Sequence, residues 1–334
     1  MASTTMWAMQ LAGPYAFMRT QVAVPTPGDL DDGQVLLRVI AGGICGSDIP
    51  YFRGVHPIPE VPGLVGRLSA ELPGFPMHEV VGEVVASRHP ETTAGSYVVG
   101  WARGMNGLAE FVVTRGDSVA GYDTSLDPGA AVMLQPLACV LDAVDQITGV
   151  AGSRVAVVGL GPIGLLFTHV LHDRGAALVT GVDQVSRREV GPEFGIGELV
   201  HASADWWASS LRDGARPQIV VEAVGHQVRT LGDAVRAAEQ GGQIFYFGIP
   251  DDPVYPFPMS EFVRKNLRLT SGVTRDRRGA LMRASAYLAR YPNLPSTYVT
   301  DVYDVEQATQ AYTLAARPAA QRLKVVLAFG PAAG

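Results

Sequence analysis

Cysteine is scarce in this sequence, which excludes a fold held by several disulfides and a zinc site with four cysteine ligands. Cys45 and Cys139 are the only cysteines among 334 residues. Two cysteines cannot build a disulfide framework, and they cannot supply a zinc site with four cysteine ligands. The chain is nevertheless long enough to form two domains with substantial hydrophobic cores.

Long apolar runs and basic clusters are also missing. No stretch approaches the roughly 18 consecutive apolar residues of a membrane-spanning helix, and the first residues lack the basic and apolar segments of a signal peptide. The formal net charge is −6 without a basic run, so nucleic-acid binding has no electrostatic support. We therefore expect a cytoplasmic globular protein that binds neither nucleic acid nor membrane.

One segment carries the pattern of a dinucleotide-binding unit. Arg154–Val158 predicts a buried strand, and the sequence Gly-Leu-Gly-Pro-Ile-Gly follows it directly at 159–164. A helical run over 165–174 and a second strand over 177–182 come next, and Asp183 ends that strand about 20 residues after the last glycine. An isolated glycine motif often marks only a turn, but these parts in this order predict a cofactor site.

Each residue type in the motif has a physical role in binding a dinucleotide. Gly159 allows the tight turn, Gly161 lets the backbone approach the pyrophosphate, and Gly164 lets helix and strand pack closely. The phosphates would then lie on the N–H groups at the start of the helix, where Pro162 and Ile163 stand.

The acid at the end of the second strand indicates which cofactor is preferred. Asp183 can accept hydrogen bonds from both ribose hydroxyls, whereas a 2′-phosphate there would meet a like charge. NAD is therefore favoured over NADP. Arg187 and Arg188 follow closely, and a guanidinium that stacks on adenine or pairs with a phosphate could relax that preference.

The strand and helix patterns divide the chain into two parts. Up to about residue 145, short β-rich segments separated by Gly and Pro predict a mostly antiparallel or barrel-like domain. These segments are Gln34–Ile40, Val80–Ala86, Tyr97–Val99 and Ala109–Thr114. From Arg154 on, alternating strands and helices predict a doubly wound parallel sheet. Its later strands are expected at Ile219–Ala223, Gln243–Gly248 and Leu267–Gly272. The remaining segment carries helices over 279–290 and 305–316 and a strand over 323–329, which we expect to pack on the first domain.

Taken together, several motifs resemble the medium-chain dehydrogenase/reductase superfamily, in its zinc-dependent alcohol and polyol (sorbitol-type) dehydrogenase branch. The motifs that carry the resemblance are Gly43-Ile44-Cys45-Gly46-Ser47-Asp48, His78-Glu79-Val80-Val81-Gly82-Glu83-Val84, Gly107-Leu108-Ala109-Glu110-Phe111, Gln135-Pro136-Leu137, Val221-Glu222-Ala223-Val224-Gly225 and Phe247-Gly248-Ile249. The resemblance covers nearly the whole chain. It implies a GroES-like catalytic domain over 1–145 and 279–334, and an NAD-binding Rossmann domain over 146–278.

The resemblance also implies site residues that local spacing does not. Cys45, His78 and Glu79 fall on the family's catalytic zinc ligands, although their spacing alone would suggest a buried cysteine and a surface histidine. A thiolate, an imidazole and a carboxylate would neutralise Zn²⁺ and leave one position for substrate or water. On the cofactor side, Val224 and Gly248 match strand ends that contact the nucleotide.

At three positions the sequence departs from the family pattern, and these departures affect which of the family's site residues can be assigned to this chain. Gln135 replaces the fourth ligand position, usually Cys, Glu or Asp, and we expect its amide in the second shell of the metal. Pro50 replaces the histidine that passes the proton to solvent, so Ser47 would accept the substrate's proton and Tyr51, a ribose hydroxyl or water would carry it onward. Met77 replaces a glycine before His78. With these changes, a modified site or a site without metal remains an alternative.

Further residues have both a functional and a structural interpretation. Trp101 and Asn106 could line the substrate pocket or belong to an ordinary loop, and His56 could be a substitute proton shuttle or an exposed loop residue. Cys139 is expected to be a core residue. The family's structural-zinc lobe is missing, since only 100–106 lies where it would be inserted. We therefore expect one catalytic zinc and no structural zinc.

The predicted function is the interconversion of a secondary alcohol and a ketone with hydride transfer to or from NAD, assisted by zinc. The resemblance implies a polyol, cyclitol or sugar-like substrate and a homodimer or homotetramer. Three alternatives remain open: a zinc-free quinone or enone reductase, a redox-neutral epimerase that retains its NAD, and a nucleotide-sensing protein without enzymatic activity.

Overall fold

The computed structural model describes residues 4–55 and 73–330, and the chain divides into two compact units. Unit 1 comprises Met1–Ala138, Arg275–Arg317 and Arg322–Gly334, and unit 2 comprises Cys139–Thr274 with the short segment Pro318–Gln321. The sequence had suggested boundaries at 145/146 and 278/279, without the short segment. Each unit is described by itself.

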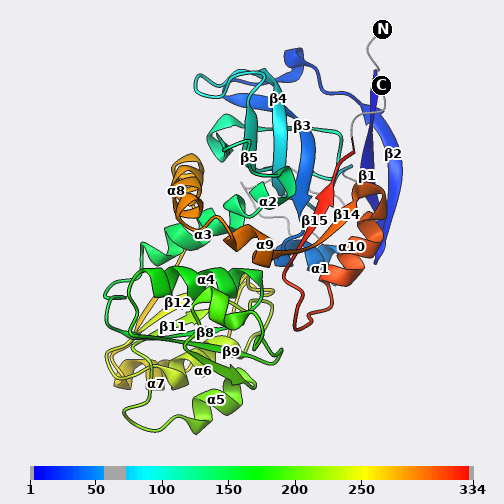
Figure 1. Cartoon of the computed structure of the whole chain (residues 1–334). Helices are drawn as coiled ribbons and strands as arrows, with labels where there is room; N and C mark the ends of the chain where they lie inside the picture. Colours follow the sequence, from blue (N-terminus) through cyan, green and yellow to red (C-terminus); the bar gives the residue numbers. More distant parts are fainter. Residues whose placement is uncertain (1–3, 56–72, 331–334) are drawn as a thin grey trace. The chain divides into compact units, whose positions relative to one another are not determined.

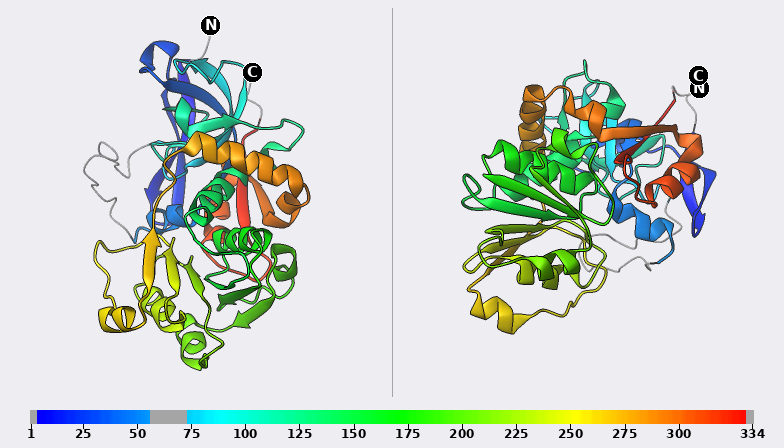
Figure 2. Two further views of the ribbon diagram at one scale, coloured as in Figure 1. Left: turned by 90° about the vertical axis from the view of Figure 1, so that its left-hand side faces the viewer. Right: turned by 60° about the horizontal axis from the view of Figure 1, so that its bottom comes forward.

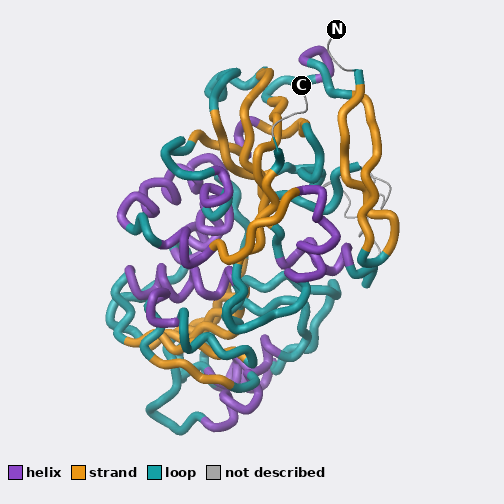
Figure 3. The backbone as a smooth tube through the Cα atoms, turned by 45° about the vertical axis from the view of Figure 1, so that its right-hand side comes forward, coloured by secondary structure: helices purple, strands orange, loops and turns teal. Residues whose placement is uncertain are grey.

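Unit 1 is built on a sheet whose strands are mostly antiparallel. Its described strands are β1 (Thr5–Gly13), β2 (Ala16–Ala23), β3 (Gln34–Gly43), β4 (Glu79–Ser87), β5 (Tyr97–Trp101), β6 (Phe111–Arg115), β7 (Val119–Gly121), β14 (Val299–Asp304) and β15 (Lys324–Ala328). The larger sheet has the order β14-β15-β3-β4-β5-β7, with β6 paired to β3, and only β14 and β15 run parallel to each other. Strands β1 and β2 form a separate two-stranded ribbon (Figure 3).

Short helices connect these strands. They are α1 (Ile49–Phe52), α2 (Pro128–Ala131), α3 (Leu134–Val144), α8 (Arg277–Arg290), α9 (Leu294–Tyr298), α10 (Ala308–Ala315) and the 3₁₀ turns η1 (Pro27–Asp29), η2 (Gly46–Asp48), η3 (Gly116–Ser118) and η5 (Val305–Gln307). Helix α3 continues into unit 2 at its C-terminal end. The β-rich character expected for this part of the chain is confirmed, and β15 pairs with β3, so the C-terminal strand returns to this sheet as predicted.

Unit 2 contains a six-stranded parallel sheet in the order β10-β9-β8-β11-β12-β13. Its strands are β8 (Arg154–Val158), β9 (Leu178–Asp183), β10 (Glu198–His201), β11 (Ile219–Glu222), β12 (Gln243–Tyr246) and β13 (Arg268–Ser271), and its helices are α4 (Pro162–Asp173), α5 (Ala204–Ser210), α6 (Thr230–Ala237), α7 (Met259–Arg264) and the 3₁₀ turn η4 (Gly191–Phe194). The order reverses between β8 and β11, which is the switch point of a Rossmann sheet. The predicted doubly wound fold is confirmed.

Helices cover both faces of this sheet (Figures 1 and 2). On one face α5 and α6 pack against buried strand residues such as Val220 and Ile244, and Trp207 of α5 lies in the same cluster. On the other face Phe167 of α4 contacts Phe245 of β12, with ring centroids 6.4 Å apart. Buried apolar side chains on both faces explain why the central strands β8 and β11 are almost entirely hydrophobic.

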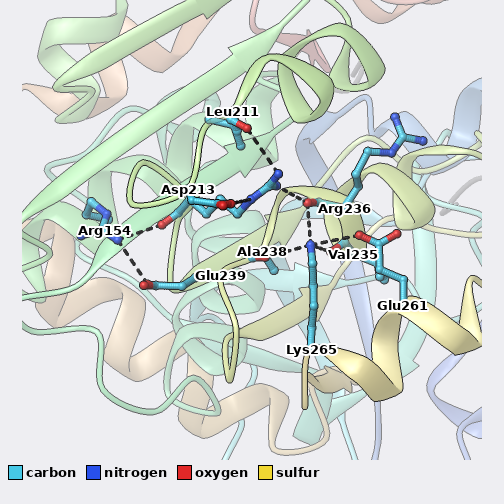
Figure 4. A network of polar contacts seen from close by, with 10 residues as sticks. Arg154, Leu211, Asp213, Val235, Arg236, Ala238, Glu239, Glu261 and Lys265 are labelled. Carbon is cyan, nitrogen blue, oxygen red and sulfur yellow. Dashed lines mark hydrogen bonds and ion pairs between the residues drawn. The ribbon is translucent and has the colours of Figure 1, made fainter.

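A polar network holds the C-terminal end of α6 (Figure 4). The Lys265 Nζ donates to the carbonyls of Val235, Arg236 and Ala238 at 3.0, 2.7 and 3.2 Å, and it pairs with Glu261 at 3.0 Å. A cation at this end satisfies carbonyls that lack helical partners and complements the helix dipole. The network therefore fixes α6 without involving any predicted site residue.

In the described parts of the chain, none of the helices is both long and apolar enough to cross a membrane.

Candidate functional site

The three predicted zinc ligands come together in unit 1. Strands β3 and β4 are antiparallel neighbours with Gly43 opposite Glu79, so the end of β3 meets the start of β4. Cys45 follows β3 by two residues, and His78 directly precedes β4. One possible ligand atom from each of Cys45, His78 and Glu79 lies within 4.8 Å of the other two. A thiolate, an imidazole and a carboxylate at this spacing form a donor set that fits a zinc ion.

A buried aspartate orients the histidine of this cluster. Asp48 is fully buried, and its Oδ1 lies 3.0 Å from Nδ1 of His78. Its other oxygen accepts the backbone N–H of Cys45 at 2.9 Å. Because Nδ1 is engaged, Nε2 is the ring nitrogen that would remain for a metal. Asp48 closes the motif that contains Cys45, but its role with His78 was not predicted from the sequence.

The charges around His78 affect its protonation. Burial disfavours the imidazolium, but the neighbouring Asp48 and Cys45 outweigh burial and raise the pKa of His78 well above its ordinary value. Without a metal, the ring therefore tends to hold its proton. Metal binding has to displace that proton.

Glu79 is already paired with a lysine from the last strand. The Nζ of Lys324 lies 2.8 and 2.7 Å from the two carboxylate oxygens of Glu79, and it also donates to the carbonyl of Ile44 at 3.1 Å. Both side chains are almost completely buried, at 3% and 1% exposure. A Cβ at Gly43 would collide with Glu79 Oε2, so the glycine makes room for the carboxylate. A metal at this site would share Glu79 with Lys324.

The predicted proton-path residues lie close to this cluster in the sequence. Ser47 is half-buried in the turn η2, and Tyr51 in α1 packs its ring against Phe75 with centroids 5.1 Å apart. Burial, and then the charge of Asp48, raises the pKa of the Tyr51 hydroxyl. His56, the possible substitute shuttle, lies outside the described residues.

Two departures from the family pattern have clear positions. Met77 is completely buried in the core of unit 1, where a Cβ added at Gly42 would collide with its side chain. Its bulk is therefore accommodated by the glycine across the sheet. Gln135 is also buried, at 2% exposure, in the first turn of α3. Its place in the second shell of a metal stays a prediction.

The remaining candidates in this part of the chain are Trp101, Asn106 and Cys139, which were considered as pocket-lining or core residues. Trp101 is 8% exposed, and the Arg277 guanidinium lies 5.4 Å from its ring centroid. Asn106 has a buried Oδ1 that no donor among the described residues satisfies. Cys139 lies on α3, where it is only half-buried rather than in the core as expected, and it does not belong to the cluster of potential metal ligands. A pocket-lining role for Trp101 and Asn106 stays a prediction.

In unit 2 the glycine motif forms the turn between β8 and α4. Gly159 has φ of +90°, and a Cβ there would lie 2.7 Å from Cγ2 of Val224. At Gly161 an added Cβ would meet nothing within 4 Å, so the backbone faces open space at the start of α4. A Cβ at Gly164 would collide with the carbonyl of Gly159. Exposed backbone at a helix start fits the pyrophosphate of a dinucleotide, with Pro162 and Ile163 in the first turn.

Asp183 at the end of β9 contacts this glycine turn. One carboxylate oxygen accepts the N–H of Leu160 at 2.5 Å and the other that of Val185 at 2.7 Å. Of the two arginines that follow, Arg187 is buried at 3% exposure and Arg188 is exposed. Only Arg188 is therefore placed at the surface, where a nucleotide could reach it.

The ends of β11 and β12 carry the last two predicted cofactor residues. The N–H of Val224 lies 3.2 Å from Oε1 of Glu222, and the N–H of Gly248 donates to the Glu222 carbonyl at 3.2 Å. Glu222 is fully buried, and burial raises the pKa of its carboxyl group against the opposing hydrogen bonds. Glu222 belongs to the motif Val221–Gly225, but its buried position and its hydrogen bonds were not predicted from the sequence.

Comparison with protein families supports the assignment of both units. Residues 31–180 match the alcohol dehydrogenase GroES-like domain, and residues 162–287 match the zinc-binding dehydrogenase domain. These matches span β3 to α8 and include Cys45, His78, Glu79 and the glycine turn.

Curated relatives and solved structures agree with the family matches. A sorbitol dehydrogenase from Halalkalibacterium halodurans is 28% identical over 319 residues, which cover 86% of this chain and 89% of the relative. A D-altritol 5-dehydrogenase from Agrobacterium fabrum is 29% identical over 266 residues, covering 72% and 77%. An alcohol dehydrogenase from Thermus sp. ATN1 shares the fold with a TM-score of 0.79 at 24% identity, over 97% of this chain and 99% of that structure. The chain belongs to the medium-chain dehydrogenase/reductase superfamily, in its zinc-type alcohol and polyol dehydrogenase branch.

Proposed function

We propose that this protein is an NAD-dependent dehydrogenase that interconverts a secondary alcohol and a ketone with one catalytic zinc ion per chain. The observation that carries the proposal is the convergence of Cys45, His78 and Glu79 within 4.8 Å. A bound zinc ion would polarise the substrate hydroxyl as a Lewis acid, and NAD would accept the hydride that leaves the carbon.

The residues around the cluster support this chemistry by holding its donors in place. Asp48 fixes the ring of His78 and the backbone of Cys45, so two ligand positions depend on one buried carboxylate. Lys324 holds Glu79 and reduces the negative charge that this carboxylate offers to a metal. Cys45 and His78 would therefore be the principal ligands, with Glu79 shared and the amide of Gln135 nearby.

Proton release is assigned to Ser47. Its hydroxyl would accept the proton of the substrate alcohol, because Pro50 cannot take the role of a relay histidine. Tyr51 would assist through its hydroxyl, whose raised pKa keeps it neutral and able to donate and accept. The final acceptor is solvent water.

Cofactor binding is assigned to the glycine turn and the strand ends around it. Gly159, Gly161, Pro162, Ile163 and Gly164 would receive the pyrophosphate. Asp183 and Arg188 would contact the adenosine ribose, and Val224 and Gly248 would border the remainder of the dinucleotide. The negative charge of Asp183 favours NAD over NADP.

The names of the relatives support a polyol or related sugar-like substrate, since these proteins are named as sorbitol and D-altritol dehydrogenases. We also propose that the protein forms homodimers or homotetramers. The edge strand β13 supports this, because Leu269 and Val273 leave apolar surface exposed beside it at 40% and 76% exposure. Sedimentation of the purified protein would measure the assembly.

Metal analysis combined with an activity screen tests the function. The protein purified from zinc-supplemented cells should hold about one equivalent of zinc and reduce NAD with members of a panel of polyols and cyclitols. Cys45→Ser should lose both zinc and turnover while keeping its fold. Less than about a tenth of an equivalent of zinc in a protein that still reduces quinones would instead favour the zinc-free reductase.

A further inference from the structure

Arg187 occupies an unexpected position for a charged residue near a nucleotide site. It follows β9 by four residues, and only 3% of it is exposed. From the sequence, Arg187 and Arg188 are equally possible partners of a cofactor phosphate. The side chain of Arg187 instead makes hydrogen bonds inside unit 2, where three backbone carbonyls accept them.

The first of these carbonyls belongs to the glycine turn itself. The Nε of Arg187 donates to the carbonyl of Leu160 at 2.9 Å, and Leu160 stands between Gly159 and Gly161. The N–H of the same residue donates to Asp183 at 2.5 Å. Leu160 is therefore held at both its N–H and its C=O by charged side chains from the end of β9, and such charge-assisted hydrogen bonds are stronger than neutral ones.

The other two carbonyls belong to the segment Pro318–Gln321. The Nη1 atom of Arg187 donates to the carbonyls of Ala319 and Ala320 at 2.6 and 2.8 Å. Next to them, Gln321 donates to the carboxylate of Glu189 at 2.5 Å. This segment lies far away in the sequence but belongs to unit 2, while the residues on either side of it belong to unit 1.

We propose that Arg187 is a positioning residue for cofactor binding: its guanidinium fixes the glycine turn through Leu160, using the segment Pro318–Gln321 as a support. The inference rests on the proposed function, because it assumes that the turn binds a dinucleotide. It assigns Arg187 no contact with the cofactor. With three carbonyls as acceptors, Arg187 also contributes no selectivity for a 2′-phosphate.

The loss of the guanidinium should affect binding more than turnover. Arg187→Ala would leave the buried carbonyl of Leu160 without its donor and let the turn move away from the geometry that receives the pyrophosphate. We expect the Kd for NAD to rise about tenfold or more, whereas kcat at saturating NAD should change less than about twofold. The affinities for NADP and ADP-ribose should fall by the same factor as that for NAD, because all three ligands share the pyrophosphate.

Titration calorimetry on the whole protein measures these affinities without requiring zinc or a substrate. Arg187→Lys should recover part of the affinity, since an ammonium group can donate to some of these carbonyls, but one nitrogen cannot occupy both the Nε and the Nη1 positions of the guanidinium. Arg174→Ala serves as the matched control. Arg174 is an arginine of the same unit that pairs with Asp145 at 2.7 Å, beyond the opposite end of α4 from the glycine turn.

Each result decides the inference. An Arg187→Ala protein with wild-type Kd for NAD and ADP-ribose would overturn it, even if its melting temperature fell. Weaker binding of NADP alone would show a phosphate contact and would overturn it too. If Arg187→Ala does not fold, an unchanged Kd for Arg187→Lys overturns the proposal and a rise of about threefold or more supports it. Failure of the wild-type protein to bind any of these ligands would contradict the proposed function itself.

Discussion

The Nδ1 atom of His78 lies 3.0 Å from Oδ1 of the fully buried Asp48. This pair links the turn after β3 to the residue that directly precedes β4, and it determines which nitrogen of the histidine would remain for a metal. Partners of this kind are important for metal affinity because they fix the tautomer and the orientation of the ring.

Asp48→Asn should weaken zinc binding about 10- to 100-fold, in the range for outer partners of metal-ligating histidines. The amide retains the shape of the side chain but loses the charge that supports His78 and one acceptor for the Cys45 N–H. Competition with a chromophoric chelator measures the affinity. Asp117→Asn, at an exposed aspartate of the same unit, should leave it unchanged. Equal affinities in wild type and Asp48→Asn would contradict the assignment.

Lys324→Met should destabilise the metal-free protein by about 3–5 kcal/mol, because it leaves the buried Glu79 carboxylate without its cation. The double variant Lys324→Met/Glu79→Gln should recover part of this loss. Urea unfolding measures both. Added zinc should stabilise Lys324→Met more than wild type, since Glu79 would then have only the metal as a positive partner. A smaller effect of zinc in the variant would argue against Glu79 as a ligand.

Asp183→Ser should narrow the preference for NAD over NADP by at least about tenfold, roughly 1.4 kcal/mol. It should also weaken binding of NAD, because the same carboxylate holds the N–H of Leu160. Catalytic efficiencies with both cofactors provide the measurement. A wild-type enzyme that uses NADP as well as NAD would show that Arg188 dominates the selectivity.

Glu222→Gln should flatten the dependence of stability on pH. The folded-state pKa of Glu222 is raised by burial, while the unfolded chain titrates near 4.3. The stabilisation from the protonated carboxyl is therefore fully present below about pH 4.3 and is lost as pH rises through the folded-state pKa. The variant should gain stability relative to wild type at pH 8 but not at pH 4. Urea unfolding of both proteins at pH 8 and pH 4 tests this. The same difference in unfolding free energy between variant and wild type at both pH values would contradict it.

Ser47→Ala should reduce turnover by about 10² or more, as expected for a general acid–base group. Tyr51→Phe should have a smaller effect, because water can replace the phenol in the path. Small bases such as imidazole should accelerate the wild-type enzyme where proton release limits the rate. Near wild-type turnover of Ser47→Ala, with chemistry rate-limiting, would exclude this serine as the first proton acceptor.

The sequence by itself determined the features that depend on neighbouring residues. The strand at 154–158, the glycine turn and the helix after it follow from local backbone requirements and hydrophobic periodicity, so their positions were predicted closely. The family motifs around Cys45 and His78 similarly predicted that these residues lie together as potential metal ligands, although their spacing alone did not.

Only the tertiary structure decided which distant groups meet. Lys324 reaches Glu79 across 245 positions of sequence, and Arg187 binds carbonyls more than 130 positions away. Such pairs leave no periodic or local signal, since the contact arises when β15 pairs with β3 or when 318–321 joins unit 2. Arg187 and Arg188 are adjacent residues of one type in the sequence. Their environments in the fold distinguish them: Arg187 is buried with three backbone carbonyls as acceptors, whereas Arg188 is exposed to solvent.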